Sequence, residues 1–173
     1  MREIWFKVFT RYQKDPALIG EWVRLIKEDV RAALATAREL VIAEAAPDAL
    51  LLGFSPQILF AVASVSEGGL DVITSPEVRD GSIPPARFSH EVLELLRAEG
   101  VVRGVVTVPM APSPSLRPQE VVARVREAVE SVSPRVLDIS GGTQLAALGA
   151  AESRAGLTYT YPLGDRVGIF RLR

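Results

Sequence analysis

Short apolar runs alternate with amphipathic stretches of helical period through most of this 173-residue chain. Each run ends at a turn rich in glycine, proline or serine, and helical spacing of apolar residues resumes after the turn. Strands and helices that alternate in this way form βαβ units, which build a mostly parallel sheet with helices on both faces. We predict strands at 49–55 (ALLLGFS), 70–75 (LDVITS), 101–110 (VVRGVVTVPM) and 135–140 (RVLDIS).

The chain closes with two further apolar segments, 157–163 and 166–173, on either side of Gly164-Asp165. A glycine-containing dipeptide between two such segments is typical of a tight β-hairpin. The predicted fold is therefore α/β, a Rossmann-like, doubly wound, mostly parallel sheet with a C-terminal β-hairpin. Helices are expected at 57–66, 90–100, 119–132 and from the glycine pair to about residue 153, and loops at 76–87 and 111–118.

The N-terminal region has a different pattern. Residues 3–11 (EIWFKVFTR) alternate apolar and polar side chains and predict a strand. Asp15-Pro16 has the form of a helix start, and apolar residues at helical spacing continue from there until Pro47. We therefore expect an arm over residues 1–46, made of one strand and one helix of about thirty residues, and a Rossmann-like domain over residues 47–173.

The composition excludes several kinds of chemistry. The chain has no cysteine, so disulfides, thiolate metal sites and a cysteine nucleophile are ruled out. Its one histidine, His90, argues against a histidine metal site or a serine–histidine pair, and we predict no metal and no cofactor. The dinucleotide fingerprint G-x-G-x-x-G is absent at 53–58, which argues against NAD or FAD.

The net charge of −1 predicts that no long nucleic acid and no acidic membrane is attracted by the whole molecule. The sequence has no apolar run of the length that a membrane span needs and no signal-peptide pattern at its charged start. We therefore expect a cytoplasmic protein without a membrane partner. Any polyanion must be bound by a local arrangement of groups.

Two loops are expected to form such an arrangement. In a doubly wound sheet, 49–55 is the first strand and 135–140 returns on its other flank, which leaves a crevice at the carboxyl ends of both strands. The loops 53–57 (GFSPQ) and 140–144 (SGGTQ) would then face each other there. Each combines small residues and hydroxyls with the start of a helix, where free N–H groups favour anions.

A purely structural explanation of the second loop stands beside this one. Asp138 and Ser140 have side chains that commonly cap a helix, and Gly141 and Gly142 would then only relieve crowding in a tight turn. If the glycines instead admit a ligand, Gly142→Val is expected to obstruct its phosphate and to leave thermal stability nearly unchanged.

The segment LDISGGTQLAALGA resembles the D-[LI]-[ST]-GGTK signature of CARF domains, the CRISPR-associated Rossmann-like domains that sense cyclic oligoadenylates. ALLLGFSPQILFAV is similar to the first strand and ligand loop of that family, often written GxSP. The resemblance covers about residues 48–173. It implies a homodimer of type III CRISPR antiviral signalling, with a cyclic tetra- or hexa-adenylate lying across the two-fold axis and its phosphates near the paired glycine loops.

Two activities remain open within this resemblance. Stand-alone chains of this length in the family are frequently ring nucleases, which cleave the messenger without metal by attack of a ribose 2′-hydroxyl on the adjacent phosphate. The family's lysine after GGT is Gln144 here, and this departure favours a receptor that binds without cleaving and acts through a partner. A Rossmann-like nucleotide-dependent enzyme from outside the family is a third alternative.

The candidate site residues follow from the two loops and the resemblance. The catalytic candidates for cleavage are Ser55, Ser140, Thr143 and Gln144. Arg79 and Arg117 lie in loops on the ligand side of the predicted sheet, and either could reach a phosphate. The full set of predicted ligand-binding residues is Gly53, Phe54, Ser55, Pro56, Gln57, Arg79, Arg117, Ser140, Gly141, Gly142, Thr143 and Gln144.

Overall fold

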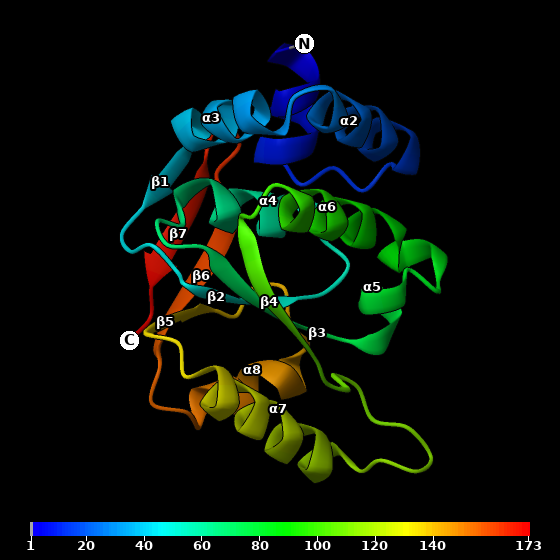
Figure 1. The fold of residues 1–173 in the computed structure, drawn as a ribbon, viewed down its shortest axis with the longest axis vertical. Coiled ribbons are helices and arrows are strands. Elements are labelled where there is room, and N and C mark those ends of the chain that lie inside the picture. The colour runs from blue at the N-terminus through cyan, green and yellow to red at the C-terminus, as the bar shows by residue number, and fades with distance from the viewer. Residues whose placement is uncertain (1) are drawn as a thin grey trace.

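A seven-stranded sheet runs through the centre of the protein, with helices on both faces (Figure 1). The computed structural model describes residues 2–173. The strands lie in the order β1-β7-β6-β5-β2-β3-β4 and are parallel except for the β6–β7 hairpin. Their bounds are β1 Val41–Ala43, β2 Ala49–Leu52, β3 Leu70–Thr74, β4 Val102–Thr107, β5 Val136–Asp138, β6 Gly156–Pro162 and β7 Val167–Arg171. The predicted fold class is confirmed.

Alternation along β2 shows how one strand serves two cores. Leu50 and Leu52 point into the core under α4 and α6, whereas Ala49 and Leu51 point into the core under α7 and α8. All four residues are fully buried, which explains why the sequence of this strand is a continuous apolar run. The helices that follow the strands are α4 Pro56–Val65, α5 Pro76–Asp80, the 3-10 helix η2 Pro84–Ala86, α6 Arg87–Ala98, α7 Pro118–Val132 and α8 Gln144–Ala151.

The N-terminal region differs from its prediction in two ways. Residues 3–11 are helical, in α1 Arg2–Ile4 and the π-helix η1 Trp5–Thr10, because Trp5, Val8 and Phe9 bury one helical face. The predicted thirty-residue helix is two helices, α2 Pro16–Glu28 and α3 Val30–Leu40.

Asp29 separates these two helices. Its backbone is extended, and its carboxylate accepts a hydrogen bond from the N–H of Ala32 at 2.9 Å, so it caps the start of α3. The chain after α3 does not continue as helix to Pro47, because Val41–Ala43 forms β1 and pairs with β7. The predicted start at Asp15-Pro16 is confirmed, since Asp15 accepts from the N–H of Ala17.

The helices α2 and α3 lie outside α4 and α6, as an additional layer on that side of the sheet (Figure 1). Trp22 of α2 is fully buried and packs edge-to-face on Phe60 of α4, with ring centroids 5.5 Å apart. Trp5 of η1 packs edge-to-face on Trp22 at 5.7 Å. These aromatic rings join the N-terminal region to the helices that cover the sheet.

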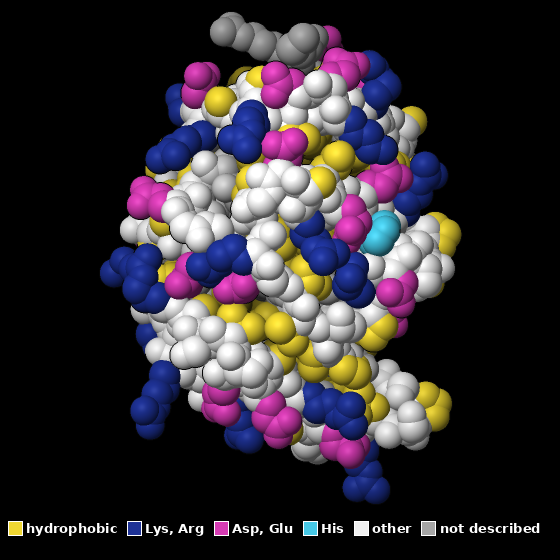
Figure 2. Space-filling view, viewed as in Figure 1, with side chains coloured by type: hydrophobic (Ala, Val, Ile, Leu, Met, Phe, Trp, Pro, Cys, Tyr) yellow, Lys and Arg dark blue, Asp and Glu magenta, His cyan; other side chains and the backbone are white. Residues whose placement is uncertain are grey.

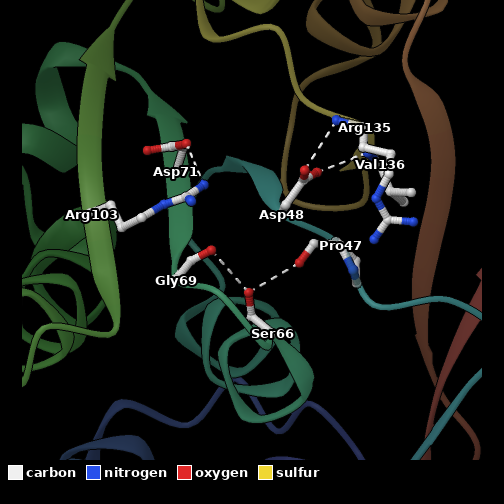
Figure 3. Close-up of polar contacts among 8 residues, drawn as sticks. All are labelled: Pro47, Asp48, Ser66, Gly69, Asp71, Arg103, Arg135 and Val136. Atoms are coloured by element: carbon white, nitrogen blue, oxygen red, sulfur yellow. Dashed lines mark hydrogen bonds and ion pairs between the residues drawn. The ribbon is translucent and has the colours of Figure 1, made fainter.

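Polar contacts hold the strands together at their amino ends (Figure 3). The carboxylate of Asp48 accepts from the N–H groups of Arg135, at 3.1 Å, and Val136, at 2.8 Å, which ties the start of β2 to the start of β5. At the edge of the sheet, Arg103 of β4 forms an ion pair with Asp71 of β3 at 2.8 Å. The central pair of strands is therefore anchored at the end opposite to the predicted crevice.

Candidate functional site

The loops after β2 and β5 touch through their backbones. β2 and β5 are hydrogen-bonded neighbours at the middle of the sheet, as predicted. A Cβ atom added to Gly53 would lie 2.2 Å from the carbonyl oxygen of Gly141, and one added to Gly141 would lie 2.3 Å from the carbonyl oxygen of Leu51. Neither glycine has a positive φ, so backbone conformation does not require glycine at these positions. Glycine is required because the two loops approach each other too closely for a Cβ atom.

A cleft of about 840 Å³ opens at the carboxyl ends of these strands. One wall comes from the paired loops, and the others come from the segments after β3 and β4 and from α7. This is the topological switch point, where ligands of doubly wound sheets bind. The predicted residues that line it are Gly53, Phe54, Ser55, Ser140, Gly141, Gly142 and Thr143.

The other predicted residues lie outside this lining. Pro56 and Gln57 face a second hollow of about 630 Å³ beside the N-terminal segment, and Gln57 is buried with its Nε2 donating to the carbonyl of Gln13 at 3.1 Å. Arg79 belongs to α5 and pairs with Glu94 at 3.1 Å. Gln144 and Arg117 are exposed, at the first residue of α8 and the N-cap of α7.

Asp138, the last residue of β5, holds the start of the second loop by hydrogen bonds. It is fully buried, and one of its oxygens accepts from the backbone N–H and the hydroxyl of Ser140. The other accepts from the hydroxyls of Thr158 at 2.9 Å and Thr160 at 2.8 Å on β6. Asp138 does not cap α8, because Thr143 does so by accepting from the N–H of Ala146.

Burial raises the pKa of Asp138 above its ordinary value of 3.8, against the lowering effect of the hydrogen bonds from Ser140, Thr160 and Thr158. The native state therefore holds this proton more tightly than the unfolded chain, so the stability from Asp138 falls as pH rises from 3.8 through the raised pKa. We expect the difference in unfolding free energy, wild type minus Asp138→Asn, to decrease across that interval and to be flat outside it. Urea unfolding between pH 3 and 8 measures this, and a difference that increases with pH would contradict the assignment.

The hydroxyl protons of the second loop are already engaged. The hydroxyl of Ser140 donates to Asp138, and that of Thr143 donates to the carbonyl of Met110. A hydroxyl has one proton, so neither group has a donor left for a ligand. Among the described residues, the hydroxyl of Ser55 forms no hydrogen bond. The backbone N–H groups of Gly53, Phe54, Ser55, Gly141 and Thr143 also have no partner within residues 2–173, so both loops contain free donors.

Gly142 has a different role from the one expected. A Cβ atom there would lie 2.9 Å from Cδ1 of Leu51, 3.2 Å from its Cβ and 3.3 Å from Cβ of Ala146, so it would point into the core under α7 and α8. The expectation that Gly142→Val leaves stability nearly unchanged is wrong, because the added methyl groups would overpack buried residues. Its effect on a ligand could not be separated from its effect on folding.

Sequence reasoning missed the charged residues of the cleft. These are Glu77, in the first turn of α5, and Arg124, seven residues into α7. Glu77 was inside a segment predicted as loop, and Arg124 lies on an amphipathic helix with several other exposed charges. The signal available was position alone, since α7 begins at the carboxyl edge of the sheet and its first turns border the crevice.

Within residues 2–173, His, Asp and Glu side chains do not gather into any group of three or more that could hold a metal ion. The same residues include no helix whose length and apolar content would suit it to cross a membrane. Comparison of the chain with models of known protein families and with curated proteins found no match.

Proposed function

We propose that the protein binds a cyclic oligoadenylate, of four or six nucleotides, in the cleft between the loops after β2 and β5. The observation that carries the proposal is the backbone contact of Gly53 with Gly141, which brings two helix starts together at the switch point. The free N–H groups of Gly141 and Thr143 suit a phosphate, because backbone N–H groups at a helix start favour negative charge. The resemblance of these loops to CARF domains supplies the ligand class.

The distribution of charge supports a local rather than a global mode of anion binding. Cationic and anionic side chains are intermixed over the face drawn in Figure 2, without a large area of one sign. The net charge of −1 agrees with this. A small polyanion would therefore be held by aimed donors inside the cleft and not by a long-range field.

The proposal includes a homodimer in type III CRISPR signalling. A cyclic oligoadenylate has rotational symmetry, and a two-fold axis through its centre would let each protomer present the same pair of loops. Two helix starts from each protomer, at α4 and α8, would then surround the ring of phosphates.

Binding without cleavage is the favoured form of this activity. Cleavage by attack of a ribose 2′-hydroxyl needs groups that hold the attack in line and donate to the phosphate oxygens. The protons of Ser140 and Thr143 are engaged elsewhere, and Gln144 is exposed outside the cleft lining. Ser55 is the one hydroxyl of the two loops left for that purpose among the described residues.

Incubation of the protein with radiolabelled cyclic tetra- and hexa-adenylate tests this proposal. We expect retention of one of the rings on a filter, with few or no linear products after several hours. Linear products in quantity would show that the protein is a ring nuclease and not a receptor. Loss of those products in Ser55→Ala would assign a role in cleavage to the Ser55 hydroxyl. Retention of neither ring at micromolar protein would overturn the proposed ligand.

A further inference from the structure

Among the residues that the structure describes, one cationic side chain lines the cleft and has no ion-pair partner. Arg124 of α7 lines it beside Ser113 and Ser115 of the preceding loop, and the only other charged residue among the described lining is Glu77. Arg124 and Glu77 form no ion pair with each other or with another described residue. The guanidinium is thus available to whatever occupies the space between the paired loops and α7.

The neighbours of Arg124 on its own helix would allow ion pairs that do not form. Glu120 and Glu127 lie four residues before and three residues after it, which are distances that bring side chains together on a helix. Glu120 instead accepts from the backbone N–H of Arg117 at 2.7 Å. By contrast Arg126, two positions along, pairs with Glu152 at 3.3 Å.

The alternative cations are directed elsewhere. Arg79 is held by Glu94, Arg117 is exposed outside the lining, and residue 144 is a neutral glutamine. Among the described residues, Arg124 therefore gives the cleft its only positive side chain. It comes from α7, whereas the free N–H groups of Gly141 and Thr143 come from the paired loops.

We propose that Arg124 binds a phosphate of the ligand and is the main determinant of affinity for a phosphorylated ring, an inference that rests on the proposed function. A guanidinium presents two parallel N–H donors that match two phosphate oxygens, and such charge-assisted pairs are stronger than neutral hydrogen bonds. The phosphate charge then has a fixed partner on each side, the N–H groups of the loop and the side chain of Arg124.

Equilibrium binding of cyclic tetra- and hexa-adenylate to wild type, Arg124→Ala and Arg124→Lys tests the inference. Loss of one charge-assisted contact weakens binding roughly 10- to 150-fold, and the proposed homodimer presents Arg124 to the ring twice, so Arg124→Ala should weaken binding by at least that factor. The dependence of log Kd on log salt should become shallower by up to about 0.7 for each phosphate contact removed. Arg124→Lys keeps the charge and should recover most of the affinity.

Arg154→Ala is the matched control. Arg154 is exposed, forms no ion pair among the described residues and borders a separate hollow with Ser133 and Pro134. The Arg154→Ala variant loses the same charge at a position away from the cleft and should bind the ring like wild type. Equal binding by wild type and Arg124→Ala would overturn the role of Arg124 and leave the proposed function standing, whereas failure of wild type to bind either ring would overturn both.

Discussion

Replacing Gly53 with alanine is expected to destabilise the protein by about 3 kcal/mol or more. The added Cβ atom would lie 2.2 Å from the carbonyl oxygen of Gly141, which is backbone and cannot rotate away. Relief requires the loops after β2 and β5 to separate at the centre of the sheet. Urea unfolding followed by circular dichroism measures the loss, and the folded fraction should also bind cyclic oligoadenylate more weakly.

Gly68→Ala is the matched control for this substitution. An added Cβ atom at Gly68 would meet no atom within 4 Å, and its φ is not positive. Alanine there should be neutral or stabilising by up to about 1 kcal/mol, since it restricts the unfolded chain. If Gly53→Ala were as stable as Gly68→Ala, the close contact between the two loops would be wrong.

Trp22→Ala is expected to cost about 3–5 kcal/mol, the range for removal of a buried tryptophan. Trp22 is fully buried, and its ring packs against Trp5, Phe9 and Phe60, with centroids 5.7, 6.1 and 5.5 Å away. Phe60 belongs to α4, so the cavity would loosen the helices that cover the sheet as well as the N-terminal region. Thermal unfolding of wild type and variant measures the change.

Trp22→Phe separates packing from polarity. The Nε1 of Trp22 is buried and has no hydrogen-bond partner among the described residues, so phenylalanine removes an unsatisfied donor while keeping an aromatic ring. We expect Trp22→Phe to lose much less stability than Trp22→Ala.

The unfolding transition of Trp22→Ala also tests the domain division. A single step would show that residues 1–46 and 47–173 are one cooperative unit, and two separate transitions would support their division into two domains.

The central part of the fold could be predicted because its strands are buried on both faces. The run ALLL at 49–52 contains only apolar residues before its turn, which distinguishes it from an amphipathic surface helix. The N-terminal region could not be predicted in the same way. In 3–11 the apolar residues fit alternation and a helical face about equally well, and burial of Trp5, Val8 and Phe9 against neighbouring helices decided for the helix.

The position of the two loops could be predicted from the sequence, because they follow the ends of neighbouring strands. The pairing of the charged side chains around the cleft could not. The carboxyl ends of parallel neighbours meet at one edge of the sheet, so the loops starting at Gly53 and Ser140 had to lie close together. Nothing in the local sequence indicates that Glu94 would hold Arg79, because that pair depends on how α5 and α6 pack. The bond from the backbone N–H of Arg117 to Glu120 is local, since Glu120 is the third residue of α7 and closes a capping box. That local pattern does not indicate that Arg124 would have no partner.

Binding of an anion in this cleft is tested most directly by a map of backbone amide chemical shifts, recorded by NMR with and without saturating cyclic tetra- or hexa-adenylate. We predict that the largest changes fall on Ser55, Gly141 and Thr143, whose groups face the cleft, and on residues around Arg124. Amides near Ser133 and Arg154, which line a separate hollow, should change little. Changes centred there, or no change at saturating ligand, would contradict the assignment of the cleft as an anion-binding site.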